Sequence, residues 1–286
     1  MTEEMQQPAA EPIIRVVDLV KRFGDNTVLD GVSLDIFPGE TVVVMGGSGC
    51  GKSTLLRHMI CSLAPDAGRV ELFGQDLADL DEAGLNAIRL RFGILFQSGA
   101  LFSSMTVGEN VALPLREHTD LDDETIDIVV KIKLEQVGLR QAADLMPAEI
   151  SGGMKKRAGL ARATALDPEV LFYDEPSAGL DPVTSAEIDQ LIMDLTGKLG
   201  VTSVVVTHEM DSAFRIADRM AMLDAGRILK LGPRGEFEQL RDGPATGDEK
   251  QDLIRQFLRG DSEGPITTRR LSTGYAQDIL RSPEAT

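Results

Sequence analysis

The chain has little of several residue types, and each scarcity excludes a class of protein. Its 286 residues include two cysteines, no tryptophan and 4% aromatic residues. Two cysteines are too few for a disulfide framework or a cysteine-based metal site. Cys50 and Cys61 lie on or beside one predicted helix, where a rise of about 16 Å separates them and prevents a disulfide. We therefore expect a reducing compartment.

Long apolar runs and an excess of positive charge are also missing. No stretch of about 18 consecutive apolar residues occurs, so we expect no transmembrane helix. Residues 1–12 are polar and acidic, which predicts a flexible N-terminus and not a signal peptide. The formal net charge of −17 argues against a nucleic-acid partner, because phosphate contacts need clustered Lys and Arg. The chain is expected in the cytoplasm, where any membrane role would need a partner.

What the chain does contain is a glycine-rich loop between a strand and a helix. The hydrophobic fraction of 42% is ample for a folded core. Residues 41–45 form a β-branched run that predicts a buried strand, and residues 55–60 predict the first turns of a helix. The loop between them has the pattern G-x-x-x-x-G-K-S and comprises Gly46, Gly47, Ser48, Gly49, Cys50, Gly51, Lys52, Ser53 and Thr54.

Each residue type in this loop suits the binding of nucleotide phosphates. Glycines let backbone N–H groups approach phosphate oxygens, and the following helix points its positive end at the same place. Lys52 can reach the β- and γ-phosphates, and the Ser53 hydroxyl suits Mg²⁺. The alternative, a glycine-rich turn with a chance lysine, leaves both flanks unexplained. We also expect Lys52 to stabilise the Cys50 thiolate, so that alkylation inactivates the protein and ATP protects it.

Strand and helix patterns alternate along the chain. Strands are predicted at residues 13–20, 28–36, 68–73, 92–96, 170–173 and 203–207, with a small hairpin at 221–229. Helices are predicted at residues 82–90, 122–137 and 182–199, and from Ser151 to a stop at Pro168. The alternation predicts an α/β protein with a mostly parallel sheet covered on both faces, into which residues 98–167 insert a helical segment. From Gly260 we expect an extended tail, with at most a short helix at 275–280.

Polar residues follow several of the predicted strands. Asp174 and Glu175 end an apolar strand, where one carboxylate can hold the Mg²⁺ shell and the other can orient a water molecule. Gln97 and His208 each follow a strand and could meet the γ-phosphate, although a lone Gln or His is more often an ordinary surface or core residue. Phe23 could stack on a base, but its spacing alone favours a place in the core.

A second glycine-containing motif stands at the start of a predicted helix. Ser151, Gly152 and Gly153 form an anion site built like the first one. Together with the other motifs, and in the same order, they resemble ABC-type ATPases over nearly the whole chain. The family usually has Gln where this chain has Met154, and we expect activity to survive because the serine and the glycines remain.

The resemblance implies a role for each motif. It gives Walker A residues at Lys52 and Ser53, a Q-loop at Gln97, the signature at Ser151, Gly152 and Gly153, Walker B residues at Asp174 and Glu175, a D-loop ending at Asp181, an H-loop at His208 and an A-loop aromatic at Phe23. The implied cofactors are ATP and Mg²⁺. Glu175, His208 and Lys52 would be catalytic, and Ser53, Gln97 and Asp174 would hold Mg²⁺. The ATP-binding residues would be Phe23, all the loop residues from Gly46 to Thr54 (Lys52 and Ser53 included), Gln97, Ser151, Gly152, Gly153 and Asp181.

The resemblance also implies the domain organisation. It predicts a P-loop NTPase core with an antiparallel β subdomain, plus an inserted ABC α-helical subdomain. The ATPase domain would span residues 13–259, with a RecA-like core at 13–97 and 168–259 and the helical subdomain at 98–167. Two chains would meet head to tail as a homodimer, so that Ser151 acts on the nucleotide of the partner. Residues 260–286 would be a C-terminal extension that contacts the neighbouring ATPase, with a disordered tail as the alternative.

Three short strings narrow the resemblance to one branch of the family. Residues 95–102, 114–119, and 145–147 with 151–154 look like the ATPase of the Mla (Mce-associated) phospholipid transport system. That resemblance implies a peripheral protein on the cytoplasmic face of the bacterial inner membrane, in a system that maintains outer-membrane lipid asymmetry. The implied partners are a permease dimer, a STAS-domain protein and, through the permease, a periplasmic MCE lipid-binding protein.

Two other readings share the ATPase chemistry. The chain could serve another ABC importer, for an amino acid or a metal, and only the Mla-like strings argue against that. It could also be a soluble ABC protein of DNA repair or translation. Repair types insert a long coiled coil, for which the 151 − 52 = 99 positions between Lys52 and Ser151 are too few. Translation types usually carry two cassettes, whereas this chain has one P-loop.

Overall fold

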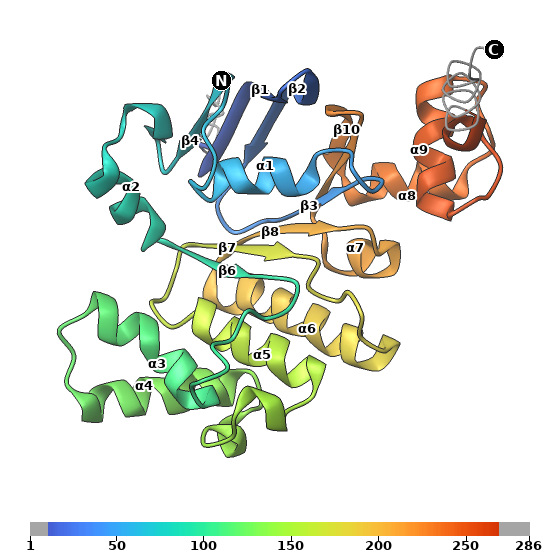
Figure 1. Cartoon of the computed structure of the whole chain (residues 1–286). Helices are drawn as coiled ribbons and strands as arrows, with labels where there is room; N and C mark the ends of the chain where they lie inside the picture. Colours follow the sequence, from blue (N-terminus) through green and yellow to red (C-terminus); the bar gives the residue numbers. More distant parts are fainter. Residues whose placement is uncertain (1–10, 269–286) are drawn as a thin grey trace, which may run out of the picture.

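A six-stranded sheet runs through the centre of the computed structural model, which describes residues 11–268 (Figure 1). Its strand order is β10-β9-β3-β8-β7-β6. These strands are β3 (Thr41–Met45), β6 (Phe92–Leu95), β7 (Val170–Asp174), β8 (Thr202–Thr207), β9 (Arg219–Asp224) and β10 (Arg227–Pro233). The five from β9 to β6 run parallel, and β10 pairs antiparallel with β9. The predicted mostly parallel sheet is confirmed.

The two faces of this sheet belong to two separate hydrophobic cores. Val42 and Val44 of β3 pack on one face with helix α1 (Lys52–Met59), while Val43 and Met45 pack on the other. The second face is covered by α5 (Gly152–Ala163), α6 (Pro182–Leu199) and α7 (Met210–Ile216). Successive side chains of a strand point to opposite faces, so a strand covered on both faces must be apolar throughout.

A smaller antiparallel sheet lies beside α1 at the top of Figure 1. Its order is β2-β1-β4-β5. The strands are β1 (Ile14–Phe23), β2 (Asn26–Ile36), β4 (Ala67–Leu72) and β5 (Gln75–Asp76). The turn between β1 and β2 places Gly24 at φ +58°, in the left-handed region that glycine adopts most readily. Helix η1 (Leu77–Asp79) and helix α2 (Glu82–Arg89) then lead the chain into β6.

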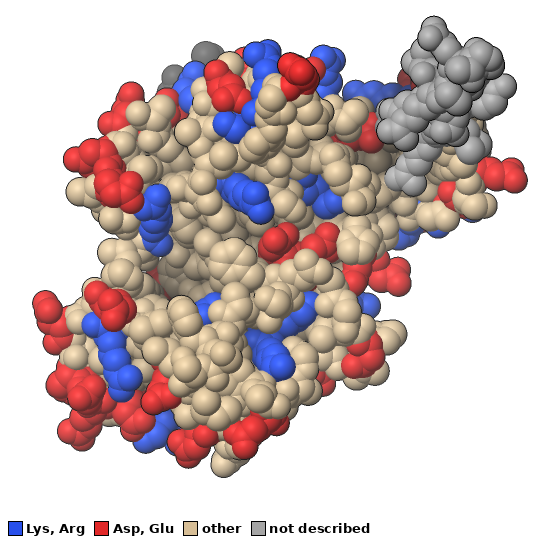
Figure 2. All heavy atoms as spheres, in the orientation of Figure 1, with Lys and Arg blue, Asp and Glu red and all other residues tan. Residues whose placement is uncertain are grey.

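Helices at the bottom of Figure 1 follow β6. They are α3 (Val107–His118), α4 (Asp123–Gln136), η2 (Arg140–Ala142), η3 (Pro147–Glu149) and α5. Thr106 and Glu109 cap the start of α3 reciprocally. Acidic residues begin α4, and Figure 2 shows acidic side chains gathered over this lower part of the molecule.

The predicted stop of the α5 helix at Pro168 is wrong. The helix ends at Ala163, five residues earlier. The Thr164 hydroxyl donates to the carbonyl oxygens of Leu160 and Ala161 at 3.0 and 3.1 Å. The Thr164 N–H also donates to the Leu160 carbonyl at 3.0 Å, so the hydroxyl adds capping contacts at a helix end that lies ahead of the proline.

The C-terminal part is more ordered than the sequence suggested. Helices α8 (Arg234–Asp242) and α9 (Glu249–Arg259) were not predicted, and residues 265–268 are helical instead of extended. The Gln256 side chain is buried and holds this segment, accepting from Ile266 N at 2.7 Å and donating to Thr267 Oγ1 at 2.9 Å. The short helix expected at 275–280 lies outside the described residues. Within residues 11–268, none of the helices combines the length and apolarity that a membrane crossing needs.

Candidate functional site

The predicted site residues of four strands meet at one edge of the central sheet. Met45, the last residue of β3, lies opposite Thr207 of β8, and Asp174 of β7 lies opposite Val206 of the same strand. Because the strands are parallel, the loops that follow them leave from the same edge. The structure therefore brings together the P-loop, the Asp174–Glu175 pair, His208 and the loop containing Gln97.

The P-loop is shaped by glycines that no other residue could replace without strain. Gly46 has φ +156°, and a Cβ there would lie 2.1 Å from the Leu223 carbonyl oxygen. Gly51 has φ +111° and precedes α1 without a side-chain cap. The first N–H groups of α1 are therefore left for an external anion. Lys52 Nζ donates to the carbonyl oxygens of Gly46 and Gly47 at 2.8 and 3.1 Å, which curls the loop around its ammonium group.

The expected reactivity of Cys50 is not supported. The Cys50 side chain is buried among apolar residues behind the loop. Burial raises the pKa of the Cys50 thiol, and the positive charge and backbone N–H of Lys52 offset only part of this effect. The prediction of a stabilised thiolate is wrong, because desolvation outweighs the nearby charge.

The Glu175 carboxylate is held at the end of β8 by two neighbouring residues. Its Oε1 lies 2.8 Å from His208 Nδ1. Its Oε2 accepts from Thr207 Oγ1 at 3.1 Å and from His208 N at 3.3 Å. Sequence reasoning found Glu175 and His208 but missed Thr207, although its place directly before His208 was a signal. These contacts orient a carboxylate and an imidazole as one unit, as a pair that positions a water molecule requires.

Oxygen-bearing groups that suit Mg²⁺ lie in the same region. Asp174 ends β7, Ser53 is exposed in the first turn of α1, and Gln97 is exposed beyond β6. Burial raises the pKa of the Asp174 carboxyl, and the charge of Glu175 adds to this effect, while Arg57 and Lys52 oppose it. A divalent cation would relieve this penalty, so a carboxylate, a hydroxyl and an amide oxygen fit Mg²⁺ together with nucleotide phosphates.

The signature residues do not join this cluster. Ser151 caps α5 by accepting from Met154 N at 3.2 Å, and α5 packs on the sheet face opposite α1. Asp181 is occupied in a similar way, since it caps α6 by accepting from Val183 N and Thr184 N at 3.0 and 3.1 Å. One chain therefore provides a phosphate loop at one place and a second candidate anion site at another.

Phe23 is an exposed aromatic residue and not a core residue. Half of its surface is accessible, at 50%. It ends β1, and Lys21 Nζ lies 5.6 Å from the centre of its ring. The interpretation from spacing alone, a place in the core, is wrong, and the exposed ring is free to stack on a base.

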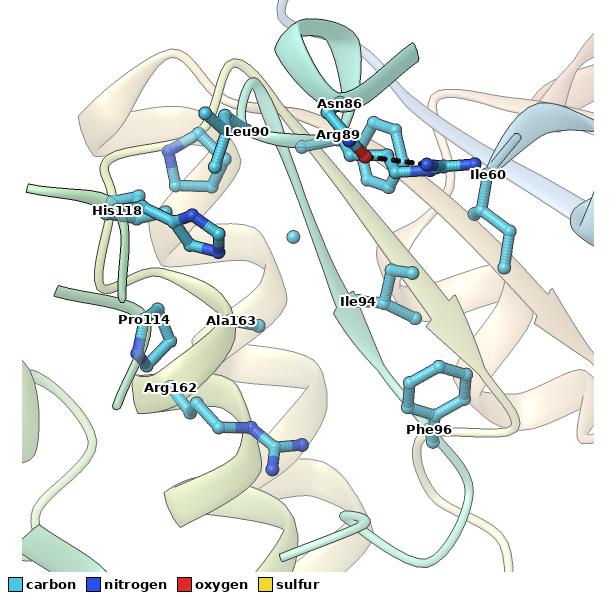
Figure 3. A pocket seen from close by; sticks show the side chains of 14 residues that line it. Ile60, Asn86, Arg89, Leu90, Ile94, Phe96, Pro114, His118, Arg162 and Ala163 are labelled. Carbon is cyan, nitrogen blue, oxygen red and sulfur yellow. Dashed lines mark hydrogen bonds between the residues drawn. The ribbon is translucent and has the colours of Figure 1, made fainter. Parts of the chain in front are cut away.

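A cleft of about 620 Å³ opens between the sheet core and the helices that follow β6. It corresponds to the hollow on the left side of Figure 2. Figure 3 shows Ile94 and Phe96 on one wall and Pro114, His118 and Arg162 on the other. Phe96, which lines the cleft, directly precedes Gln97 in the sequence. A protein segment bound in the cleft would therefore contact the loop that contains Gln97.

Comparisons with known proteins agree with this arrangement. The model of the ABC transporter family matches residues 29–178. The chain is 40% identical to the intermembrane phospholipid transport system ATP-binding protein MlaF of Escherichia coli strain K12 over 276 residues, covering 96% of this chain and 99% of that protein. It is 44% identical over 253 residues to a probable ribonucleotide transport ATP-binding protein of Mycobacterium leprae, covering 88% of this chain and 70% of that protein.

A solved structure is also similar over most of the chain. It is a dimeric ATP-binding cassette in a post-hydrolysis state with ADP and phosphate. The TM-score is 0.72 at 32% identity, and the match covers 77% of this chain and 98% of the other.

Proposed function

The chain belongs to the ABC transporter family, whose ATP-binding subunits hydrolyse ATP for transport, and we propose that this one drives the movement of phospholipids. The observation that carries the proposal is the extent of the similarity to the Mla proteins. The match to the Haemophilus influenzae protein covers 94% of this chain and 98% of that relative. The proposed route connects the inner membrane with a periplasmic MCE-type lipid-binding protein.

The geometry supports a separate role for each group of site residues. The P-loop and the start of α1 would bind the phosphates, with Lys52 leaving the Gly46 and Gly47 carbonyls for phosphate oxygens. Mg²⁺, held through Ser53, Gln97 and Asp174, would neutralise charge on the phosphates. Glu175 would orient the attacking water and His208 would hold Glu175 in place.

A second chain would complete the site. Ser151 begins α5 on the sheet face opposite α1, so the signature cannot close over the P-loop of its own chain. Two chains arranged head to tail would place each signature against the nucleotide of the other. The similar solved cassette is dimeric with ADP and phosphate bound, which supports a dimer. The C-terminal extension of residues 260–286 would add contacts to the neighbouring ATPase, although residues 269–286 of it lie outside the described part of the chain.

The cleft of Figure 3 is the proposed docking surface for the permease. Its walls are largely apolar, and the charged or titratable residues among those that line it are Arg89, His118 and Arg162. No Asp or Glu is among these lining residues, although the chain has a net charge of −17. A permease segment with an apolar face and a carboxylate would complement this cleft. A STAS-domain protein is the further proposed partner on the cytoplasmic face of the inner membrane.

A second candidate cargo comes from the mycobacterial relatives. Their name describes probable ribonucleotide transport, and they are 44% identical to this chain. They extend well beyond the matched region, since the match covers 70% of the Mycobacterium leprae protein. The same ATPase chemistry would serve either cargo, and also an importer for an amino acid or a metal.

A pull-down of the tagged full-length chain from membranes in mild detergent tests the cargo and the partners together. Mass spectrometry should identify a permease, a STAS-domain protein, an MCE-type protein and co-purified phospholipid. A His118→Glu variant places a carboxylate in the cleft and should recover less permease, whereas Lys131→Glu on the exposed side of α4 should not. Recovery of a permease with a soluble solute-binding protein, and without lipid, would refute phospholipid transport.

A further inference from the structure

Lys156 is a buried cation in the middle of helix α5. Its accessible surface is 4%, and burial lowers its pKa while Glu209 and Glu175 oppose the shift. Its ammonium donates to the Ala178 carbonyl oxygen at 2.7 Å and to the Glu175 carbonyl oxygen at 3.3 Å. Removing an ammonium group from water costs free energy, and an apolar side chain at this position would avoid that cost. The hydrogen bonds of Lys156 must therefore offset this cost or serve a function.

Both carbonyls belong to the turn that carries Glu175. Glu175 has φ +49°, a left-handed conformation that residues with a Cβ seldom adopt. Its N–H is fixed by the Val206 carbonyl at 2.9 Å, and its own carbonyl accepts from Ala178 N at 3.3 Å. Lys156 supplies the remaining contact from the helical side. The ammonium thus holds the backbone on which the Glu175 carboxylate is mounted.

The same helix begins with the signature residues. Lys156 follows Ser151 by five positions, which is about 7.5 Å along the helix. The start of α5 also lies close to the first turn of α6, because a Cβ on Gly153 would lie 2.5 Å from Thr184 Cγ2. A displacement of Ser151 must therefore carry Lys156 with it, since an α-helix moves as a rigid element over this length.

We propose that Lys156 is a positioning residue that transmits contact at the signature to the catalytic turn at Glu175. When Ser151 meets the nucleotide of a partner chain, α5 shifts as a unit and Lys156 adjusts the turn on which Glu175 lies. Each chain would then sense the partner's nucleotide before its own Glu175 is aligned. The inference rests on the proposed role of Glu175 and on the head-to-tail dimer.

The test compares ATP hydrolysis by the full chain carrying Lys156→Met, Lys156→Arg or the control Lys131→Met. Met keeps the length but removes the donor, whereas Arg keeps a charged donor. We expect kcat to fall at least tenfold in Lys156→Met, with the Kd for ATP within twofold of the parent, and to recover to within about threefold in Lys156→Arg. Lys131, half exposed on α4, should leave both constants unchanged.

Three outcomes would overturn the proposal. They are a kcat of Lys156→Met within twofold of the parent, a parallel loss of kcat and ATP affinity, and an Arg variant as impaired as the Met variant. If Lys156→Met does not fold, Lys156→Leu, which also lacks a donor, takes its place with the same criteria. Glu175→Gln is measured beside them, and near-normal turnover there would remove the role of Glu175 itself, independently of the Lys156 result.

Discussion

Replacing Asn110 with alanine should destabilise the connection between the sheet core and the helical part of the chain. Asn110 is fully buried on α3, and its side chain makes four hydrogen bonds to the loop that follows Gln97. Its Oδ1 accepts from Phe102 N at 2.7 Å. Its Nδ2 donates to the carbonyl oxygens of Phe102, Met105 and Thr106 at 3.1, 3.2 and 2.9 Å.

The loss of stability depends on which backbone groups are left without a hydrogen-bond partner. The carbonyls of Phe102 and Thr106 keep backbone donors, at Met105 N and Asn110 N respectively. The Phe102 N–H and the Met105 carbonyl lose their bonds to the Asn110 side chain. A buried group left without a partner costs about 1–3 kcal/mol, and partial access of water to this loop reduces that cost. We expect a loss of about 2–3 kcal/mol, or roughly 5 °C in Tm for a chain of this size.

Circular dichroism at 222 nm is the suitable assay, because the chain has no tryptophan for a fluorescence signal. Asn86→Ala is the matched control, since Asn86 is exposed on α2 and should change stability by less than about 0.5 kcal/mol. Limited proteolysis should also cleave residues 101–106 faster in Asn110→Ala than in the parent chain. A Tm within about 1 °C of the parent would show that water replaces all four bonds and would refute the reasoning.

Two further predictions concern the catalytic pair and the cysteines. Glu175→Gln should retain ATP binding and stabilise a closed dimer while turnover falls at least about a hundredfold, because an amide cannot take the proton of the water. Size-exclusion chromatography with ATP measures the dimer, and a phosphate-release assay measures turnover. A normal turnover rate would contradict the role of Glu175. Both thiols should react slowly with iodoacetamide at pH 8, because burial raises the pKa of Cys50 and raises that of Cys61 to about 11. The rate should rise as the pH approaches 11 and on unfolding in urea; rapid labelling of Cys50 in the native protein at pH 8 would restore the view that Lys52 stabilises its thiolate.

Local patterns in the sequence determined most of the elements that build the nucleotide site. The β-branched run of β3, the glycines at 46 and 51 and the proline at the start of α6 each impose a backbone conformation through their own stereochemistry. The parallel sheet follows from the alternation of strands and helices, because parallel strands need a crossover between them. Residues that follow such strands must gather at one edge, which is why Asp174 and His208 could be found without coordinates.

The interactions between residues far apart in the sequence depend on the folded structure. Lys156 and Ala178 are 22 positions apart, and no periodicity connects a helical lysine with the carbonyl of a later turn. The burial that raises the pKa of Cys50 and the exposure of Phe23 depend on what packs around them, which composition does not encode. The Gln256 contacts that order residues 260–268 depend in the same way on a fold already formed. Dihedral preferences act within a few residues, whereas desolvation and hydrogen bonding across the core depend on the whole chain.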